Sequence, residues 1–248
     1  MRATARAEAR HFWFRGFRWF VTPLIRRALE GATHVRILDC GCGTGANLTL
    51  LTEFGSAYGF DISATGLNIG RSLGRRDLVR ASVTAAPFAS ESFDLVTSFD
   101  VLYALDHDDE QAALAEMFRL TRPGGHAVIN VAAMNILRGD HSVLSREVRR
   151  YTTATLGQAV TRSGFAIERL TYTNATLFLP LLALRTLHRS RGLAREADAH
   201  HEIAVPGAPV NALLSAVLFL ESLWLRRFSS PAGSSLLCLA RKPGQNSR

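Results

Sequence analysis

The sequence predicts an α/β protein built on a mostly parallel sheet, and three observations carry this prediction. Short apolar segments alternate with amphipathic helical segments from position 35 onwards. A glycine-rich turn follows the first apolar segment, and a carboxylate ends the second. Strands that alternate with helices in this way form βαβ units, and helices then cover both faces of the sheet.

The expected elements follow one another at regular intervals along the chain. We expect strands at 35–39, 57–61, 77–82, 93–99, 126–133, 165–173 and 234–242. We expect helices at 46–54, 63–72, 108–120 and 153–163, and a turn at 122–125. Buried strands are predicted from short apolar runs that stop at turn residues, and helices from apolar residues at helical spacing.

The segment between the last two strands is unusually apolar. It contains two helical patterns, at 174–189 and 210–228. On the second pattern one stripe is apolar and the opposite side is mostly polar. The apolar stripe is Leu213, Val217, Leu220 and Trp224, and the opposite side is Asn211, Ser215, Ser222 and Arg226. The run LLSAVLFLESLWL is interrupted by Glu221 and is expected to be too short to span a bilayer.

Length and composition limit the class of protein. The chain has 248 residues, of which 47% are hydrophobic and 20% charged, so it can build one large domain, or one domain with an insertion. The net charge is +8, which favours anionic neighbours. The basic start of the chain lacks the apolar core of a secretory signal. We therefore expect a cytoplasmic protein, with possible peripheral contact to a membrane.

The cysteines do not predict a metal centre. Cys40 and Cys42 are two positions apart, which does not fit the C-x-x-C spacing of zinc or redox sites, and no histidine cluster lies nearby. Buried thiols in a reducing compartment explain Cys40, Cys42 and Cys238.

The sharpest motif is ILDCGCGTGANL at 37–48, in which Asp39 ends a strand and a helix follows the glycines. Gly41, Gly43 and Gly45 allow the backbone to turn tightly and to approach a ligand closely. Asp61 ends the next strand, and a carboxylate there can accept hydrogen bonds from both hydroxyls of a ribose.

Two nucleoside cofactors compete for this loop. GCGTGA also satisfies the dinucleotide fingerprint G-x-G-x-x-G/A. A pyrophosphate is bound by backbone donors at a helix N-terminus, and Asp39 would repel such an anion. A carboxylate instead suits a cationic amino acid conjugate with an ammonium and a sulfonium, which describes S-adenosylmethionine.

At this point the chain resembles the class I S-adenosylmethionine-dependent methyltransferases. The matching segments are ILDCGCGTG, GFDIS, APFASESFDLV, DVLYALDHDD and LTRPGGHAVI, in family order. HFWFRGFR, HSVLSREVRRY and YTNATLFLP are similar to motifs of a bacterial group with an N-terminal HWWFRGR-like stretch. The resemblance implies a Rossmann-like, seven-stranded sheet with an antiparallel last strand.

The resemblance also implies a division of the chain and a cofactor site. Residues 1–30 would form a helical lid, 31–173 and 234–242 the cofactor-binding core, and 174–233 an apolar helical insertion. The implied cofactor contacts are Asp39, Gly41, Cys42, Gly43, Asn47, Asp61, Ile62, Ser82, Val83 and Phe99.

Two positions depart from the family. Ser82 stands where an acidic residue often contacts the adenine amino group, and Val101-Leu102-Tyr103-Ala104 replaces a V-L-E-H pattern.

Methyl transfer from a sulfonium is an in-line displacement, in which positioning and desolvation carry most of the work. A hydroxyl or amine acceptor also needs a base. His141 is the first candidate because it follows the fifth strand, at the carboxyl edge of the sheet. His107 and Tyr151 are weaker candidates. Arg149 is expected either to bind an anionic substrate group or to cap the next helix.

The stretch HFWFRGFRWF at 11–20 holds six aromatic residues. As a helix it would align Trp13, Phe17, Phe20 and Leu24, with Arg15, Arg18 and Arg26 facing away. Core packing, a lid over the carboxyl edge and an interfacial membrane contact are all compatible with it. In the lid interpretation Trp13, Phe14, Arg15, Tyr103 and Arg149 contact the substrate.

The sequence thus predicts a methyltransferase that acts on a hydrophobic small molecule, a lipid-linked intermediate or a secondary metabolite, by O- or N-methylation. The alternatives are an NAD(P)-dependent oxidoreductase and a non-catalytic, membrane-associated binding protein of the same fold. A nucleic-acid substrate is not expected, because Ser98-Phe99-Asp100-Val101 replaces the N-P-P-Y-like turn of amino-base methyltransferases. No separate basic RNA-binding module is visible either. The oligomeric state is left open.

Overall fold

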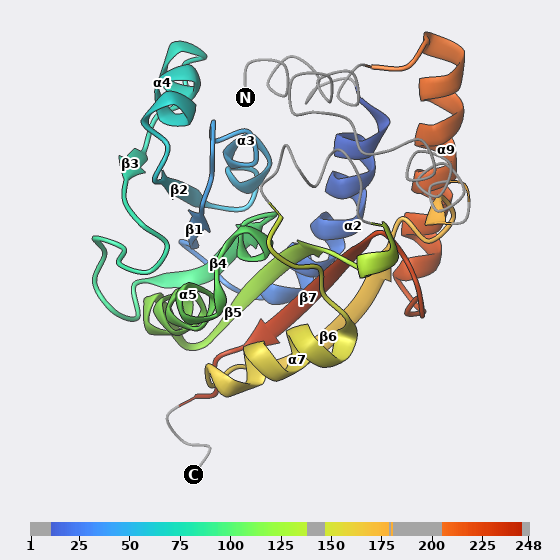
Figure 1. The fold of residues 1–248 in the computed structure, drawn as a ribbon. Coiled ribbons are helices and arrows are strands. Elements are labelled where there is room, and N and C mark those ends of the chain that lie inside the picture. Colours follow the sequence, from blue (N-terminus) through green and yellow to red (C-terminus); the bar gives the residue numbers. More distant parts are fainter. Residues whose placement is uncertain (1–10, 138–146, 179, 181–204, 245–248) are drawn as a thin grey trace.

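A seven-stranded sheet forms the centre of the computed structural model, which describes residues 11–137, 147–178, 180 and 205–244 (Figure 1). The order of the strands is β3-β2-β1-β4-β5-β7-β6. Their bounds are β1 Arg36–Cys40, β2 Ser56–Asp61, β3 Leu78–Arg80, β4 Phe93–Phe99, β5 Thr121–Ala132, β6 Ala166–Thr173 and β7 Ser235–Arg241.

The direction of the strands confirms the predicted α/β fold. Strands β1 to β5 pair in parallel, whereas β7 pairs antiparallel with both β5 and β6. The chain changes direction along the sheet between β1 and β4, and in open α/β sheets ligands bind beyond the carboxyl ends of the strands at such a point. The last residues of β1, β2 and β4 are Cys40, Asp61 and Phe99, so the predicted cofactor residues lie at this edge.

Helices cover both faces of the sheet (Figure 1). Helices α5 and α7 pack on one face, and α2 and α9 pack on the other. The helix bounds are α2 Phe12–Ala28, α3 Leu48–Leu51, α4 Ala64–Ser72, α5 His107–Leu120, α7 Thr153–Arg162 and α9 Ala208–Leu225. A 3-10 turn, η1 Leu102–Ala104, follows β4, and a second, η2 Asn135–Leu137, follows β5.

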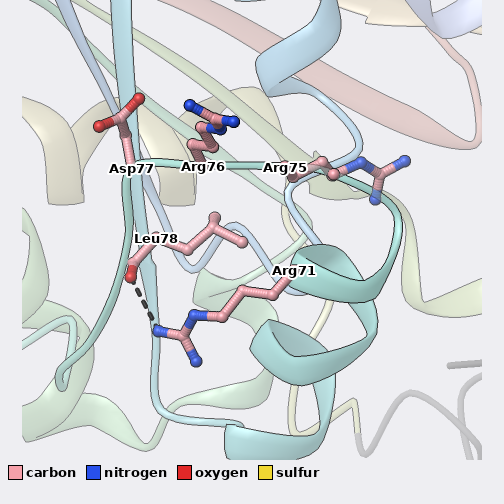
Figure 2. Close-up of a pocket in the computed structure, with 6 residues that line it drawn as sticks. Arg71, Arg75, Arg76, Asp77 and Leu78 are labelled. Atoms are coloured by element: carbon pink, nitrogen blue, oxygen red, sulfur yellow. Dashed lines mark hydrogen bonds between the residues drawn. The ribbon is translucent and has the colours of Figure 1, made fainter.

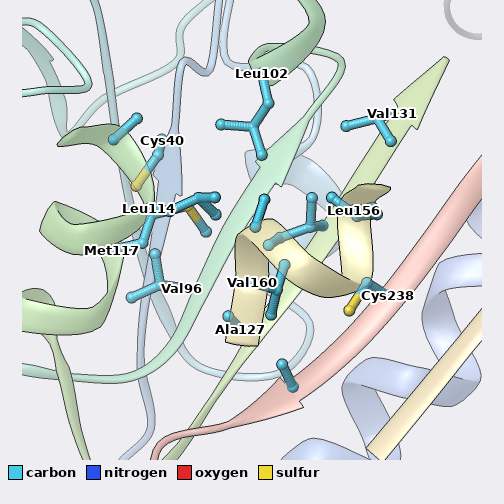
Figure 3. Close-up of a cluster of buried hydrophobic side chains, with 14 of the residues drawn as sticks. Cys40, Val96, Leu102, Leu114, Met117, Ala127, Val131, Leu156, Val160 and Cys238 are labelled. Atoms are coloured by element: carbon cyan, nitrogen blue, oxygen red, sulfur yellow. The ribbon is translucent and has the colours of Figure 1, made fainter. Parts of the chain in front are cut away.

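Successive strand residues point to opposite faces, so each strand contributes to two separate cores. Leu38 and Val96 join the core beneath α5 and α7, whereas Ile37 and Leu95 join the core beneath α2 and α9. Figure 3 shows the first core, where Leu114 and Met117 of α5 and Leu156 and Val160 of α7 surround the central strands. These four helix residues are 0–2% exposed.

Most expected elements are present, but two differ from the prediction. The helix expected at 46–54 is confined to Leu48–Leu51, with turns on both sides. Thr49 and Thr52 are β-branched and Gly55 is flexible, which disfavours a longer helix. Residues 122–125, where a turn was expected, form part of β5, which begins at Thr121. The helix expected at 174–189 lies mostly outside the described residues.

Helix α2 buries a different stripe from the expected one. Phe20 and Leu24 are buried as predicted, together with Gly16, Val21 and Ile25. Trp13 and Phe17 are only half-buried. The shift brings Gly16 against α9, where a Cβ added at Gly16 would lie 2.5 Å from Cδ1 of Leu218. A glycine at this position therefore permits the close approach of the two helices.

Helix α9 packs against the fold mainly through its polar side. The buried side is Ser215, Leu218, Glu221, Ser222 and Leu225, whereas most of the predicted apolar stripe is exposed. The prediction that this segment is too short to span a bilayer is also corrected. Among the described residues one helix, Ala208–Leu225, is long and apolar enough to cross a membrane by length and composition. Length and composition do not by themselves make α9 a membrane-spanning helix, because α9 also packs against α2 in this fold.

Candidate cofactor site and acceptor edge

The glycine loop forms a tight backbone turn after β1. Gly41, Gly43 and Gly45 have φ angles of 77°, 57° and 75°, in the left-handed region that favours glycine. The N–H groups of Gly41 and Cys42 both donate to the carbonyl of Phe60 at 2.9 Å, which ties the loop to β2.

The glycines of this loop differ in the space around them. A Cβ at Gly41 would lie 2.4 Å from Cγ2 of Val101, so Gly41 is needed for packing. A Cβ at Gly43 would meet nothing within 4 Å. The loop is therefore closely packed at its base and open at Gly43.

Asp61 orders the open part of the loop. Its Oδ2 accepts a hydrogen bond from the Gly43 N–H at 2.7 Å, and its Oδ1 accepts one from the Ser63 N–H at 2.7 Å. Each carboxylate oxygen has a further lone pair. The half-buried carboxylate at the end of β2 can thus hold the loop and still accept hydroxyl donors.

Asp39 is a buried carboxyl group with one unsatisfied oxygen. Asp39 is 1% exposed. Its Oδ1 accepts a hydrogen bond from Oγ1 of Thr97 at 2.7 Å. Oδ2 has no hydrogen-bond partner. Burial raises the pKa of Asp39 to about 7, and the nearby Asp61 adds to this rise, while the Thr97 hydrogen bond opposes it. A buried carboxyl in this state is stabilised in its ionised form by a cation.

These features fit an amino acid conjugate of a nucleoside. The unsatisfied Oδ2 of Asp39 suits an ammonium, the open position at Gly43 leaves room beside the loop, and Asp61 suits a ribose. Ile62 follows Asp61 directly and is 68% exposed, so it offers an apolar surface next to the ribose position. The donor set therefore fits S-adenosylmethionine better than it fits a pyrophosphate.

The remaining predicted cofactor residues contribute in different ways. Ser82 shares a 2.8 Å hydrogen bond with Thr84, and half-buried Val83 packs against the core. Asn47 precedes α3 without a capping hydrogen bond from its side chain. The Cys42 thiol is buried, and burial raises its pKa well above the usual range, so it acts as a packed apolar group.

The end of β4 meets the aromatic helix α2. Phe99 and Phe17 contact edge to face, with ring centroids 4.9 Å apart and an interplanar angle of 77°. This contact lies at the carboxyl edge of the sheet, because Phe99 is the last residue of β4. The N-terminal part of α2 therefore reaches the edge that carries the glycine loop.

Asp100 is a residue that the sequence interpretation missed. It follows β4 directly, has a φ angle of 61° and is exposed. Its N–H donates to the carbonyl of Asn130 at 2.9 Å, and Nδ2 of Asn130 donates to its Oδ1 at 3.0 Å. Non-glycine residues in this region are strained and cluster at functional sites. The position immediately after a strand end was the available sequence signal.

The structure does not support a catalytic role for Tyr151. The residue is 2% exposed, and its hydroxyl donates to a carboxylate oxygen of Glu110 and lies 3.2 Å from the carbonyl oxygen of Leu102. Burial, followed by the contact with Glu110, raises the pKa of Tyr151 well above its usual range. A phenol with a raised pKa is almost entirely protonated near neutral pH and so is not available to accept a proton, which makes Tyr151 better explained as a structural group.

Arg149 and Tyr103 also fix the chain near this edge rather than lining an open site. The guanidinium of Arg149 donates to Oε2 of Glu110 at 2.8 Å and to the carbonyl of Leu105 at 3.0 Å. Tyr103 is 7% exposed, and its carbonyl accepts the N–H groups of Val148 and Arg149. An anionic substrate would therefore have to compete with Glu110 for Arg149.

The other candidate base and the lid residues have different outcomes. His141 lies outside the described residues, so its catalytic role stays a prediction. His107 is exposed, with Nδ1 3.8 Å from Oε2 of Glu110. Trp13 and Phe14 are half-buried in the first turn of α2, and exposed Arg15 lies over the ring of Trp19 at 5.5 Å.

A pocket of about 460 Å³ lies at the connection between α4 and β3. It is lined by Arg71, Gly74, Arg75, Arg76, Asp77 and Leu78. Figure 2 shows Arg71 hydrogen-bonded to Leu78, and the bond to the carbonyl is 3.0 Å long. Arg75 donates to both oxygens of Thr44 at 2.8 Å, so this wall supports the loop from outside. In the described part of the chain no group of three or more His, Cys, Asp or Glu residues could hold a metal ion.

The fold and this site define a class I methyltransferase domain with S-adenosylmethionine as its cofactor. Residues 38–129 match the model of the methyltransferase domain family. The matched segment runs from within β1 to within β5 and includes Asp39, the glycine loop and Asp61.

A curated relative matches part of the chain. A ubiquinone/menaquinone biosynthesis C-methyltransferase of Xylella fastidiosa (strain M23) is 39% identical over 104 residues, which are 37% of this chain and 40% of the relative. The chain thus matches less than half the length of that relative.

Solved structures extend the likeness in fold to nearly the whole chain. A Haloferax volcanii methyltransferase, solved with its activator, has a TM-score of 0.61 at 18% identity and covers 99% of this chain and 96% of its own. An S-adenosylmethionine-dependent methyltransferase of Mesorhizobium loti has a TM-score of 0.54 at 22% identity and covers 89% of this chain and 97% of its own. These likenesses concern the fold. They leave open the bacterial group suggested by HFWFRGFR.

Proposed function

We propose that this protein transfers a methyl group to a hydrophobic small molecule or lipid-linked intermediate. The observation that carries the proposal is the unsatisfied, buried Oδ2 of Asp39 beside a glycine loop that is open at Gly43. When bound, S-adenosylmethionine supplies an activated methyl group, so the protein needs only to bind, orient and desolvate the reactants.

The residues divide this work between cofactor and acceptor. Asp39 would pair with the ammonium group of the cofactor, and Asp61 would accept hydrogen bonds from its ribose hydroxyls. Ile62 and Val83 would contact the adenine. The aromatic start of α2, with Trp13 and Phe14, lines the acceptor side and excludes water. The contact of Phe17 with Phe99 supports this arrangement because it brings α2 to the carboxyl edge.

The acceptor class rests on two independent features. The acceptor side is aromatic rather than acidic, which suits an apolar ring or chain. The relative from Xylella fastidiosa is named as a quinone-pathway C-methyltransferase, so carbon joins oxygen and nitrogen as a candidate acceptor atom. His141 remains our proposed base, and a cytoplasmic location remains our expectation.

Binding experiments test the cofactor separately from the acceptor. In titration calorimetry the protein should bind S-adenosylhomocysteine and should not bind NAD+ or NADP+. Binding of a dinucleotide instead would replace the methyltransferase with the oxidoreductase alternative.

The acceptor is then identified without assuming its structure. Methyl-labelled S-adenosylmethionine is incubated with the protein and a lipid extract of the parent strain, and labelled products are separated by mass spectrometry. The Asp61→Ala variant is the control. Incorporation that is equal in the control and the parent protein would show that the label does not depend on this site.

A further inference from the structure

Helix α9 presents an apolar outer face that the rest of the described chain leaves exposed. We define this outer face as Val210, Leu213, Leu220, Trp224 and Phe228, which are 46–65% exposed. Their spacing of three, four or seven places them along one side of the helix. Phe228 continues the helical pattern, since its N–H donates to the carbonyl of Trp224 at 3.1 Å.

The inner side of α9 prevents the helix from turning its apolar face inwards. Glu221 is 5% exposed, and its carboxylate accepts hydrogen bonds from the N–H groups of Ala175 and Thr176 at 2.8 and 3.0 Å. The hydroxyl of Thr176 donates to the same carboxylate at 2.5 Å. Rotation of the helix would break these bonds and leave the buried polar groups unsatisfied.

The C-terminal end of the outer face is held in one geometry. The guanidinium of Arg169 donates to the carbonyls of Leu225 and Phe228, the latter at 2.8 Å. The rings of Trp224 and Phe228 stack with centroids 5.5 Å apart and an interplanar angle of 27°. The face thus ends in a fixed aromatic pair.

Among the described residues at 205–228, the exposed charges are all basic. Between 205 and 228 the only acidic residue is Glu221, which is buried, and two exposed arginines, Arg226 and Arg227, adjoin the aromatic pair. On the α2 side, exposed Arg15 lies over Trp19, whose ring meets Phe219 of α9 edge to face at 5.3 Å. The surroundings of the face are therefore basic.

We propose that the outer face of α9 docks on a membrane surface that contains anionic lipids, with the helix lying in the interface. Apolar side chains, a tryptophan at one end and flanking arginines are the features that anchor interfacial helices. A spanning arrangement would separate Glu221 from Ala175 and Thr176. A second copy of the chain would bring its own arginines and no exposed acidic residue of α9 to the contact. The docking face goes beyond the proposed methyl transfer and does not depend on it.

Vesicle sedimentation with the full chain tests the proposal. Vesicles of phosphatidylcholine with phosphatidylglycerol should sediment the protein, and vesicles of phosphatidylcholine alone should do so more weakly. Leu220→Glu should lower the partition coefficient by about tenfold or more, because a charge replaces an apolar anchor. The matched control is Leu73→Glu directly after α4, which places the same charge at a leucine that is 56% exposed.

Charge and depth are tested separately. The double variant Arg226→Glu with Arg227→Glu should lose the preference for anionic vesicles, whereas Arg76→Glu with Arg162→Glu should keep it. Tryptophan emission should shift to the blue on anionic vesicles, and Trp224→Phe should remove most of the shift.

Three results would overturn the docking face. The first is that the wild-type chain does not sediment with anionic vesicles. The second is that Leu220→Glu and Leu73→Glu lower the partition coefficient equally. The third is that the protein binds no vesicles and forms a dimer that Leu220→Glu dissociates. The last result would assign the face to a second copy. A Gly43→Ala variant that loses S-adenosylhomocysteine but still sediments would separate docking from cofactor binding.

Discussion

At the scale of single residues, the site depends on one carboxyl group that is unfavourable for the fold. Asp39 is buried, and its Oδ2 has no partner. Sequence reasoning placed Asp39 close to the end of the first strand, which runs to Cys40, because a short apolar run there stops at glycines. It did not find Thr97, which holds Oδ1, because Thr97 lies 58 positions away in the chain and meets Asp39 only through sheet pairing.

Binding of S-adenosylhomocysteine should strengthen as the pH rises through about 7. The raised pKa of Asp39 means that the group is largely neutral below this pH and ionised above it. Only the ionised form attracts the ammonium. Calorimetry at a series of pH values measures the affinity, and Asp39→Asn should bind weakly and without this pH dependence. An unchanged dependence in the variant would assign the titration to another group.

The same substitution should have the opposite effect on stability. A carboxyl whose pKa is higher in the folded state favours folding less as the pH rises from the unfolded value of 3.8 towards 7. Asp39→Asn should therefore raise the melting temperature of the unliganded protein at pH 8 and change it little at pH 4. Thermal unfolding followed by circular dichroism gives both values. A loss of stability at pH 8 would contradict the burial argument.

Two glycines of the loop should respond differently to the same change. Gly41→Ala and Gly43→Ala both carry the cost of a left-handed residue, about 1–2 kcal/mol. Gly41→Ala should lose more stability, because the methyl group would lie 2.4 Å from Val101. Gly43→Ala should mainly weaken cofactor binding. Denaturant unfolding and calorimetry separate the two effects, and equal stability losses would show that the loop shifts to accommodate Gly41→Ala.

At the scale of elements, the contact between α2 and α9 shows the limit of sequence patterns. Periodicity found both helices and the apolar stripe of α9, but it could not say which side of α9 packs against the fold. The structure buries Ser215, Glu221 and Ser222 instead, because Gly16 lets α9 approach α2 closely and residues 175 and 176 satisfy Glu221. A partner far away in the chain thus overrides the local hydrophobic pattern. His141 and most of the other apolar segment, 174–189, lie outside the residues that the structure describes.

A double-mutant cycle should detect the close approach of these helices. Gly16→Ala should destabilise the protein despite the higher helix propensity of alanine, because its Cβ would lie 2.5 Å from Cδ1 of Leu218. Combined with Leu218→Ala, it should cost less than the sum of the two single variants. Urea unfolding of the four proteins measures the coupling. Additive losses would mean that the two side chains do not compete for space.

At the scale of the whole molecule, the sheet was predictable to a large extent. The alternation of strands and helices predicted all seven strands, and the resemblance supplied the antiparallel last strand. The order of strands does not follow from periodicity, because it depends on how the crossover connections pack. The location of the cofactor site could be predicted from the residues that end the strands. The hydrogen-bond network of Glu110, Arg149 and Tyr151 could not be predicted, because only the fold brings these residues together.

Cofactor binding should stabilise the entire domain. A ligand at 100 times its dissociation constant adds about 2.7 kcal/mol to the free energy of unfolding. For a chain of this size that corresponds to a rise of about 5–10 °C in melting temperature. S-adenosylhomocysteine should produce this rise in differential scanning calorimetry, and NAD+ should not. A rise with neither ligand would argue against a preformed nucleoside site.

The position of β7 between β5 and β6 has a consequence for folding during synthesis on the ribosome. Residues 166–173 can be synthesised and can leave the ribosomal tunnel long before Ser235–Arg241 exist, yet β6 pairs with no other strand. Until β7 arrives, the nascent chain carries one incomplete sheet with an open edge at β5 and a separate apolar strand. The sheet is therefore completed only once β7 is available, and both edges stay open during the synthesis of about sixty intervening residues.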